Sequence, residues 1–225
     1  MSTPCKAVFF DLDGTLADTA PDLAYALNQT LQRAGRPALP YETIRPAASH
    51  GAAALLQVGF GSDLPDDERD QLRQHLLDVY QANITRHTAL FPGMDELLQR
   101  IEARGLRWGV VTNKPSYLTI PIMQGLGLAQ RACSIVSGDT LSERKPHPAP
   151  LIHACREANC LAAESLYLGD AERDIQAGRS AGMRTLVALY GYIGEADAPH
   201  AWGADGRIHA PLELLDWLNT SSHTK

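Results

Sequence analysis

Short apolar runs alternate along this chain with segments whose apolar residues recur at helical spacing. The runs read KAVFF, LRWGVVT, CSIVSG, SLYLGD and RTLVALY, at residues 6–10, 106–112, 133–138, 165–170 and 184–190. Each is short, mostly apolar and partly β-branched or aromatic, which is typical of a strand buried on both faces. Strands that alternate with helices in this way form a parallel sheet between helical layers. The alternation therefore predicts an α/β fold with a parallel sheet and helices on both faces.

The segments between the runs have helical periodicity. At residues 94–105, Leu97, Leu98 and Ile101 fall on one face, and Gly105 occupies the position of a C-terminal cap. The sequence also predicts helices over residues 148–158, 172–182 and 211–220. These helices would cover the two faces of the sheet.

One interval breaks the alternation. Residues 20–87 contain no convincing strand, but the stretches 21–35 and 66–81 carry apolar residues in helical register. These residues are Leu23, Leu27, Leu31 and Ala34 in the first stretch and Leu72, Leu76 and Val79 in the second. We therefore expect an α-helical cap domain at residues 20–87, inserted after the first strand, and a core domain made of residues 1–19 and 88–225.

The composition is that of an ordinary globular protein. The chain has 225 residues, 44% of them hydrophobic, and a formal net charge of -6. It has no polybasic block to attract nucleic acid or an anionic membrane, and no apolar stretch near the roughly 20 residues of a membrane span. Its four cysteines show no C-x-x-C spacing, and the N-terminus lacks the regions of a signal peptide. We expect a cytoplasmic protein, monomer or homodimer, with no nucleic-acid or membrane partner.

Polar residues gather where the predicted strands end. In chain order they are Asp11 and Asp13 after the first run, Thr112 and Asn113 after the second, Lys145 in the loop after the third, and Asp170 and Asp174 after the fourth. In an open α/β sheet, ligands bind outside the carboxyl ends of the parallel strands. This placement predicts that the polar side chains meet at one site.

Four motifs at these strand ends resemble those of the haloacid dehalogenase superfamily of phosphohydrolases. They read DLDGTLADT, VVTNK, RKPHPAP and GDAERD, in the usual order of that superfamily. The resemblance implies a Rossmann-like core with a helical cap and a phosphomonoesterase activity. Within the superfamily, TNKP and KPHPAP resemble the phosphoglycolate phosphatases, while WGVVTNKP, ALYGYI and WGAD resemble more closely the N-acetylmuramic acid 6-phosphate phosphatases. The implied substrate is a small phosphorylated metabolite that carries a carboxylate, either 2-phosphoglycolate or N-acetylmuramic acid 6-phosphate.

A divalent cation would offset the repulsion between the aspartates and a phosphate dianion. Mg²⁺ prefers oxygen ligands in near-octahedral geometry, and these motifs supply such oxygens. The expected ligands are the carboxylates of Asp11 and Asp170 and the backbone carbonyl of Asp13, with Asp174 acting directly or through water. Asp174 could instead serve only as a favourable charge at a helix N-terminus.

The resemblance also implies the catalytic roles. Asp11 would attack phosphorus and form an aspartyl-phosphate, and Asp13 would act as general acid and then as general base. Asp13 must therefore hold a proton when the ester binds, which we expect its anionic surroundings to favour. Thr112 and the Asn113 backbone N–H would bind phosphoryl oxygens, and Lys145 would offset charge in the transition state.

Other members of the superfamily can be partly separated by sequence. A dehalogenase does not need Asp13, and a phosphonate-cleaving enzyme needs a cap lysine, whereas residues 20–87 contain no lysine. A phosphosugar mutase would keep all four motifs and stays an alternative. A phosphate-binding module without catalytic activity is a further alternative, although it would have no need of Asp13.

The cap is expected to select the substrate. Arg45 and His50 are the cap residues we expect to approach it, because a carboxylate-bearing ester favours a cation nearby. A solvated Arg45 together with a helix-capping Ser49 explains the sequence equally well. Even in contact with a carboxylate, Arg45 could not discriminate between phosphoglycolate and N-acetylmuramic acid 6-phosphate, since both carry one.

Overall fold

The computed structural model describes residues 4–219 and contains a parallel sheet of six strands. Their order is β5 (Ile135–Val136), β4 (Arg107–Val111), β1 (Ala7–Phe10), β6 (Ser165–Gly169), β7 (Arg184–Ala188) and β8 (Gly206–Ile208). The chain builds outward from β1 to β4 and β5, and then returns to add β6, β7 and β8 on the other side. The carboxyl ends of β1 and β6 therefore lie at the point where the strand order reverses, which is where open sheets bind ligands.

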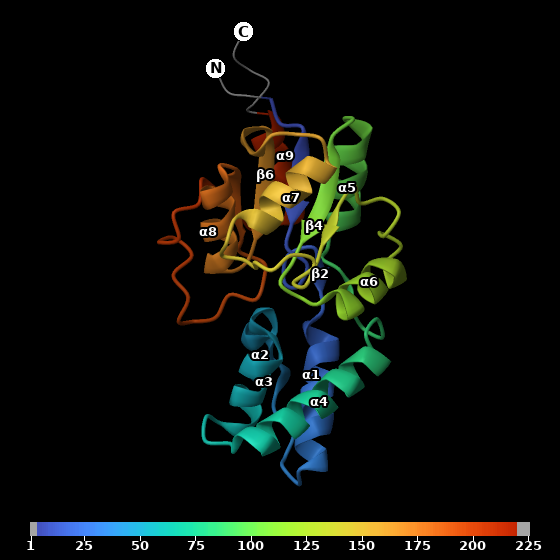
Figure 1. The fold of residues 1–225 in the computed structure, drawn as a ribbon, viewed down its shortest axis with the longest axis vertical. Helices are drawn as coiled ribbons and strands as arrows, with labels where there is room; N and C mark the ends of the chain where they lie inside the picture. The colour runs from blue at the N-terminus through green and yellow to red at the C-terminus, as the bar shows by residue number, and fades with distance from the viewer. Residues whose placement is uncertain (1–3, 220–225) are drawn as a thin grey trace.

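The predicted sheet with helices on both faces is confirmed (Figure 1). Phe9 points into a core cluster that includes residues of α7 (Ala149–Glu157) and α8 (Glu172–Ala181). Its neighbours Val8 and Phe10 point the opposite way, because successive strand residues alternate between faces. They belong to a second core cluster, to which α5 (Met94–Ala103), α6 (Ser116–Gly125) and α9 (Leu214–Asn219) contribute on this face of the sheet.

Several elements depart from the expected boundaries. β5 has two residues where CSIVSG predicted a longer strand, and β8 was not predicted. Residues 211–220 form a short 3₁₀ turn, η3 (Pro211–Glu213), followed by α9, and residue 220 of that prediction lies outside the described range. A second 3₁₀ turn, η2 (Ala162–Glu164), precedes β6.

Residues 20–87 form helices and connecting turns, as expected. The elements are α1 (Ala20–Arg33), α2 (Tyr41–Ile44), the 3₁₀ segment η1 (Arg45–His50), α3 (Gly51–Phe60) and α4 (Asp66–Ala82). They lie together beneath the core in Figure 1, on the opposite side from the two chain ends. The two connections to the core pair with each other as β2 (Ala17–Asp18) and β3 (Ala89–Leu90). The domain limits near residues 19 and 87 stay a prediction, which the position of this hairpin supports.

A buried carboxylate ties these two connections together. The Asp22 side chain, in the first turn of α1, accepts hydrogen bonds from the backbone N–H groups of His87 and Thr88 and from the Thr88 hydroxyl. Hydrogen bonds to a buried carboxylate are worth more than neutral ones. The cap is thus anchored by its first helix to the segment that re-enters the core.

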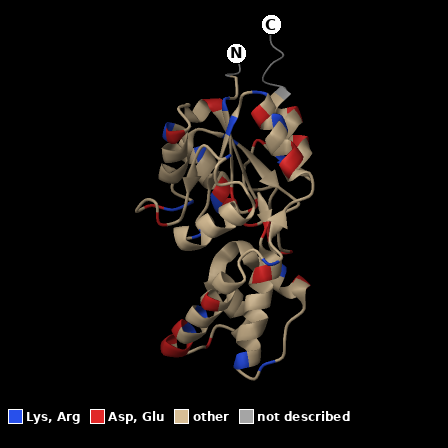
Figure 2. Ribbon diagram, turned by 90° about the vertical axis from the view of Figure 1, so that its right-hand side faces the viewer, with Lys and Arg blue, Asp and Glu red and all other residues tan. Residues whose placement is uncertain are grey.

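Charged residues of both signs are spread over the core and the cap (Figure 2). Among residues 4–219, no helix has the combination of length and apolarity that crossing a bilayer requires.

Candidate active site

The segment after β1 is a tight loop that aims carboxylates at the end of the sheet. The Asp11 N–H still donates to Leu168 of β6, so the backbone stays in sheet register up to this residue. Two residues after Leu12, Gly14 adopts a φ of +80°, a conformation that residues with a side chain rarely accept. A Cβ at Gly14 would also collide with the carboxylate of Asp170. The glycine therefore lets the loop fold directly against the neighbouring strand end.

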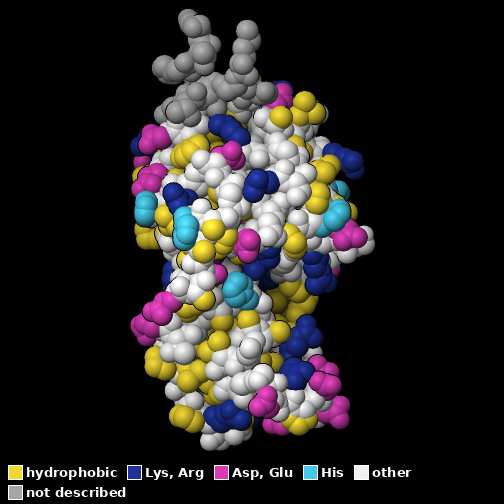
Figure 3. Space-filling view, turned by 90° about the vertical axis from the view of Figure 1, so that its left-hand side faces the viewer, with side chains coloured by type: hydrophobic (Ala, Val, Ile, Leu, Met, Phe, Trp, Pro, Cys, Tyr) yellow, Lys and Arg dark blue, Asp and Glu magenta, His cyan; other side chains and the backbone are white. Residues whose placement is uncertain are grey.

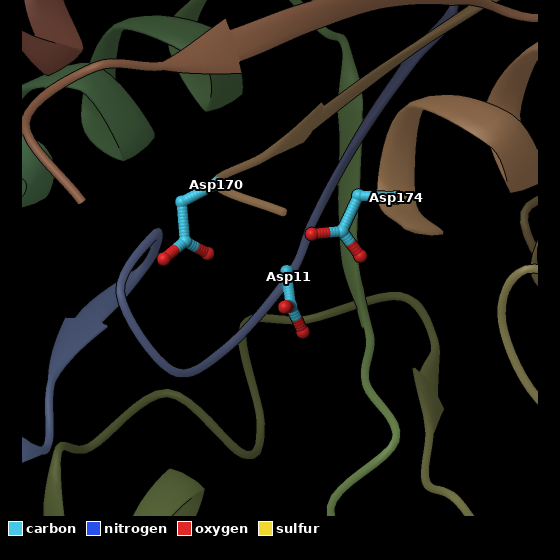
Figure 4. A group of neighbouring side chains, drawn as sticks. All are labelled: Asp11, Asp170 and Asp174. Atoms are coloured by element: carbon cyan, nitrogen blue, oxygen red, sulfur yellow. The ribbon is translucent and has the colours of Figure 1, made fainter. Parts of the chain in front are cut away.

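Three carboxylates converge here. Asp11 follows β1, Asp170 follows β6, and Asp174 lies in the first turn of α8, with one oxygen of each within 4.8 Å of the others. Figure 4 shows Asp11 between the other two, each carried by a different segment. Their exposed fractions are only 3%, 2% and 0%. Three like charges this close and this dry need a cation.

Lys145 supplies one positive charge. Its Nζ lies 2.9 Å from Oδ1 of Asp11 and 2.7 Å from Oδ1 of Asp174, and it donates to the Tyr167 hydroxyl at 2.8 Å. The Asn113 side chain holds the backbone of Lys145 through two hydrogen bonds, of 2.9 and 3.0 Å. Asn113 thus positions the lysine loop, a role that sequence reasoning missed.

Arg173 adds a second positive charge near the three carboxylates; burial opposes this charge, but the carboxylates raise the pKa of Arg173. Two cations still leave an excess of negative charge. Burial, followed by the charges of Asp11 and Asp174, raises the pKa of Asp170 to about 7. Burial also raises the pKa of Asp174, against the opposing effect of Lys145. A buried, oxygen-only donor set with excess negative charge fits Mg²⁺, which binds carboxylates and backbone carbonyls.

Asp13 has a different environment from Asp11. Its Oδ1 lies 2.8 Å from Nζ of Lys114 and accepts a hydrogen bond from the Thr19 hydroxyl at 2.5 Å. The expectation of anionic surroundings for Asp13 was therefore wrong: its direct charged partner is a cation, delivered by the residue after Asn113. Burial opposes the charge on Lys114, but Asp13 outweighs burial and the Lys114 pKa is raised. Sequence reasoning missed Lys114, although TNK places it beside the predicted phosphate-binding residues.

A cavity of about 450 Å³ lies between this site and the cap. The predicted site residues among its lining are Asp11, Asp13, Thr112, Asn113 and His50. The described lining does not include Lys145, Asp170 or Asp174. Lys145 forms an ion pair with Asp11, and the two aspartates each have an oxygen within 4.8 Å of an Asp11 oxygen.

Arg45 does not line the cavity. Its guanidinium donates to the carbonyl of Tyr190 at 3.0 Å and lies 5.0 Å from the centre of the Tyr192 ring. Arg45 therefore holds the cap against the loop after β7, and a substrate contact by Arg45 stays a prediction without support from its position.

Ser49 brings the cap onto the acidic cluster. Its hydroxyl donates to Oδ2 of Asp170 at 2.7 Å, and Arg173 of α8 donates to its carbonyl. The next residue is His50, whose Nδ1 lies 3.2 Å from a guanidinium nitrogen of Arg173. Burial lowers the pKa of His50, and the charge of Arg173 lowers it further. The cap segment 45–50 thus lies over the strand ends, and His50 lines the cavity. An approach of His50 to the substrate stays a prediction, which this position supports.

Comparison with known proteins decides the family. The family model described as haloacid dehalogenase-like hydrolase matches residues 8–188. This chain belongs to the haloacid dehalogenase-like hydrolase family. The four motifs that resemble this family span the matched region, and the predicted membership is confirmed.

This haloacid dehalogenase-like hydrolase is similar to named phosphatases over nearly its whole length. It is 46% identical to the N-acetylmuramic acid 6-phosphate phosphatase of Pseudomonas putida, covering 96% of this chain and 97% of the relative. It is 43% identical to the phosphoglycolate phosphatase of Xanthomonas campestris pv. campestris, covering 94% and 95%. A crystal structure of a predicted phosphoglycolate phosphatase from Haemophilus somnus superposes with a TM-score of 0.85, at 28% identity and 96% and 99% coverage. The chain is a phosphatase of this family.

Proposed function

We propose that this phosphatase is a Mg²⁺-dependent phosphomonoesterase that works through an aspartyl-phosphate on Asp11. The observation that carries the proposal is the meeting of Asp11, Asp170, Asp174 and Lys145 beneath the cavity. We further propose that it acts in the cytoplasm, which the lack of C-x-x-C spacing among its cysteines supports, on a small carboxylate-bearing phosphate ester. The relatives named above support 2-phosphoglycolate and N-acetylmuramic acid 6-phosphate as candidates.

Asp11, Asp170 and the Asp13 carbonyl would hold the cation, with Asp174 acting directly or through water. Bound there, Mg²⁺ would offset the negative charge that keeps a carboxylate and a phosphate dianion apart. Lys145 acts from the protein side, because its ammonium lies against the nucleophile and stabilises charge that develops on the phosphoryl oxygens.

The chain's own residues carry the chemistry in two steps. In the first, a carboxylate oxygen of Asp11 bonds to phosphorus and the ester P–O bond breaks. Asp13, which must take up a proton when the ester dianion binds even though Lys114 opposes this, gives that proton to the leaving oxygen. In the second, Asp13 takes a proton from water as that water attacks phosphorus and releases Asp11. Thr112 and the Asn113 N–H hold phosphoryl oxygens, and both residues line the cavity. The docked cap keeps other water away from the intermediate.

Phosphate release from a panel of phosphate esters, with and without Mg²⁺, tests the proposal. We expect turnover that needs Mg²⁺, and Asp11→Asn should abolish both turnover and the trapping of phosphorylated enzyme. Activity near that of the unmodified protein in Asp11→Asn would rule out the nucleophile role. Binding without turnover of any ester would favour the phosphate-binding module, and phosphate transfer between positions of a sugar would favour the mutase.

A further inference from the structure

The cavity extends well beyond the residues that would hold phosphate. Its volume of about 450 Å³ falls in the range of roughly 300–1,000 Å³ that is typical of pockets for drug-sized ligands. Phosphoglycolate adds only a two-carbon acid to its phosphate and would leave much of this space unfilled. The remaining wall includes Leu76 and Tyr80 of α4, and Lys114, Tyr117 and Leu118 of the core. The shape of the site therefore favours a larger leaving group.

Tyr80 carries an unusual hydroxyl group. The residue is fully buried, yet it belongs to the cavity wall. Among residues 4–219, its Oη is the one buried side-chain nitrogen or oxygen atom with no hydrogen bond of ordinary length. The Lys114 ammonium beside it can only donate, so the hydroxyl hydrogen has no acceptor in the described part of the protein. A buried hydroxyl without a partner lowers stability, so native proteins rarely keep one without a reason. A ligand atom in the cavity would supply the missing partner.

Lys114 lies beside this hydroxyl group and connects it to the chemistry. Its Nζ is 4.6 Å from the centre of the Tyr80 ring and 2.8 Å from Oδ1 of Asp13. Asp13 is the proposed proton donor to the leaving oxygen, so Lys114 and Tyr80 lie on the leaving-group side of the phosphate. Burial raises the pKa of Tyr80 to about 12, against the effect of Lys114, so the hydroxyl keeps its proton at neutral pH and can donate it in a hydrogen bond.

The charges around the cavity favour an anionic leaving group. Arg73 of α4, and Arg144 and Arg173 of the core, line it together with Lys114, whereas Asp11 and Asp13 are the acidic residues among its described lining. On the face shown in Figure 3, Lys and Arg side chains gather at the waist between core and cap, next to hydrophobic side chains. Apolar walls from Leu76 and Leu118 would pack against the carbon skeleton of the ligand.

We propose that Tyr80 and Lys114 form a leaving-group subsite that binds a hydrogen-bond acceptor of a sugar-sized, carboxylate-bearing phosphate ester. The Tyr80 hydroxyl donates to a neutral or anionic oxygen of the leaving group, and Lys114 adds a positive charge beside it. The subsite rests on the proposed function, because it requires an ester whose phosphate lies on Asp11.

Comparing kcat/KM for three phosphate esters separates the effect of leaving-group size from that of its carboxylate charge. N-acetylmuramic acid 6-phosphate has both, N-acetylglucosamine 6-phosphate has the bulk without the carboxylate, and 2-phosphoglycolate has the carboxylate without the bulk. We expect kcat/KM to fall in that order, by about 10-fold or more between the first and the last, as loss of one to three good contacts implies. Equal values for the three esters, or a preference for phosphoglycolate, would overturn the subsite and leave the phosphatase function intact.

Tyr80→Phe tests the hydroxyl itself. It should lower kcat/KM for N-acetylmuramic acid 6-phosphate by about 10-fold, since one hydrogen bond to the larger leaving group is lost. The ratio of this kcat/KM to the kcat/KM for phosphoglycolate should fall as well. Its Tm should change little, because the hydroxyl hydrogen has no acceptor among the described residues and Lys114 keeps its ion pair with Asp13. Tyr25→Phe is the matched control, since Tyr25 lies in cap helix α1 and outside the cavity lining. It should change neither kcat/KM for N-acetylmuramic acid 6-phosphate nor the ratio of the two kcat/KM values.

The outcomes distinguish the two proposals. If Tyr80→Phe lowers Tm and leaves the ratio of the two kcat/KM values unchanged, the hydroxyl serves the fold and the subsite is refuted. If no ester releases phosphate with Mg²⁺ present, the proposed function fails and the subsite fails with it. If phosphate is released but the ratio is the same in both tyrosine variants, the subsite alone fails.

Discussion

Asp11 and Asp13 have the same side chain and lie two residues apart, but their partners give them different chemistry. Asp11 is 3% exposed and lies in the acidic cluster, with Lys145 against it. Asp13 contacts Lys114 and Thr19 and faces the cavity. Both residues line the cavity, as a nucleophile and a proton-transfer group each must. Asp11 is fixed by Lys145 within the acidic cluster, whereas Asp13 lies outside that cluster. The proposed roles follow from these environments.

Lys114→Met should weaken both activity and stability. Asp13 would lose the cation that holds it, and a buried carboxylate without its partner costs roughly 3 kcal/mol of unfolding free energy. We expect kcat to fall about 10-fold to 100-fold, since a misplaced general acid loses much of its effect. Urea unfolding and steady-state kinetics measure the two quantities.

Lys6→Met is the matched control for this prediction. Lys6 also pairs with a carboxylate, that of Glu164, but its side chain is 55% exposed. It precedes the amino end of β1, whereas the site residues follow the carboxyl ends of the strands. Exposed ion pairs contribute little to stability, so Lys6→Met should leave kcat and the free energy of unfolding unchanged. If the two lysine variants behave alike, Lys114 has no special relation to Asp13.

The raised pKa of Asp170 predicts how stability depends on pH. Without metal, the folded state holds a proton on Asp170 up to about pH 7, whereas an ordinary aspartate loses it near pH 4. The folded state thus binds more protons in this window, so the free energy of unfolding falls as pH rises, by about 1.4 kcal/mol for each unit of pKa difference. Mg²⁺ should therefore stabilise the protein more at pH 8 than at pH 5.

Asp170→Asn isolates this contribution. In EDTA, the variant should show a shallower loss of unfolding free energy between pH 4 and pH 7 than the unmodified protein, because the amide does not titrate. Chemical unfolding at four or five pH values measures both slopes. Identical slopes would show that Asp170 titrates normally in the folded state.

At the scale of elements, the sequence predicts the sheet well because buried parallel strands carry a strong signal. The strand β1 is apolar along its whole length, and β4, β6 and β7 are mostly apolar after their first one or two residues, since both faces are covered. β8 was missed because it has three residues and one of them is the exposed Arg207. Edge strands of this kind are defined by their neighbour more than by their own composition.

The residues of the site also fall into those that the sequence predicts and those that it does not. The strand-end aspartates could be predicted because their motifs are local in sequence. Tyr80 could not, because helical periodicity shows only that it is buried, and a residue facing a cavity looks the same as one facing the core. The Ser49 contact with Asp170 depends on how the cap docks, which no local pattern records. The Lys114 contact with Asp13 joins the ends of two strands that are distant in sequence, so TNK alone does not reveal it.

Arg45→Ala tests the contact between the cap and the loop after β7. Arg45 donates to Tyr190 and stacks on Tyr192, so its removal should loosen the docked cap. We expect KM to rise about threefold to 10-fold for esters with and without a carboxylate alike, since a surface cation–π contact and one hydrogen bond contribute about 1 kcal/mol. Kinetics with N-acetylmuramic acid 6-phosphate and N-acetylglucosamine 6-phosphate measure the effect. A rise restricted to the carboxylate-bearing ester would instead support the substrate contact predicted from the sequence.

At the scale of the whole molecule, the cap and the core meet at the site and join through the β2–β3 hairpin (Figure 1). The cap touches the acidic cluster through Ser49, and α4 contributes Tyr80 to the wall opposite. A ligand between them therefore contacts both parts. The ligand shifts the protein toward the docked arrangement only if it binds that arrangement more tightly than the open one.

Hydrogen exchange tests this coupling. Mg²⁺ together with orthovanadate, a phosphate analogue, should slow exchange in η1 and in the second half of α4, because the ligand pair stabilises the state in which the cap is docked. Mg²⁺ alone should protect mainly the loops after β1 and β6, which carry Asp11 and Asp170. Amides of β8, at the far edge of the sheet, serve as the internal control and should not change. Protection confined to the core with both ligands present would mean that the cap does not respond to the phosphate site, and substrate selection by Tyr80 would then require the leaving group itself to close the cap.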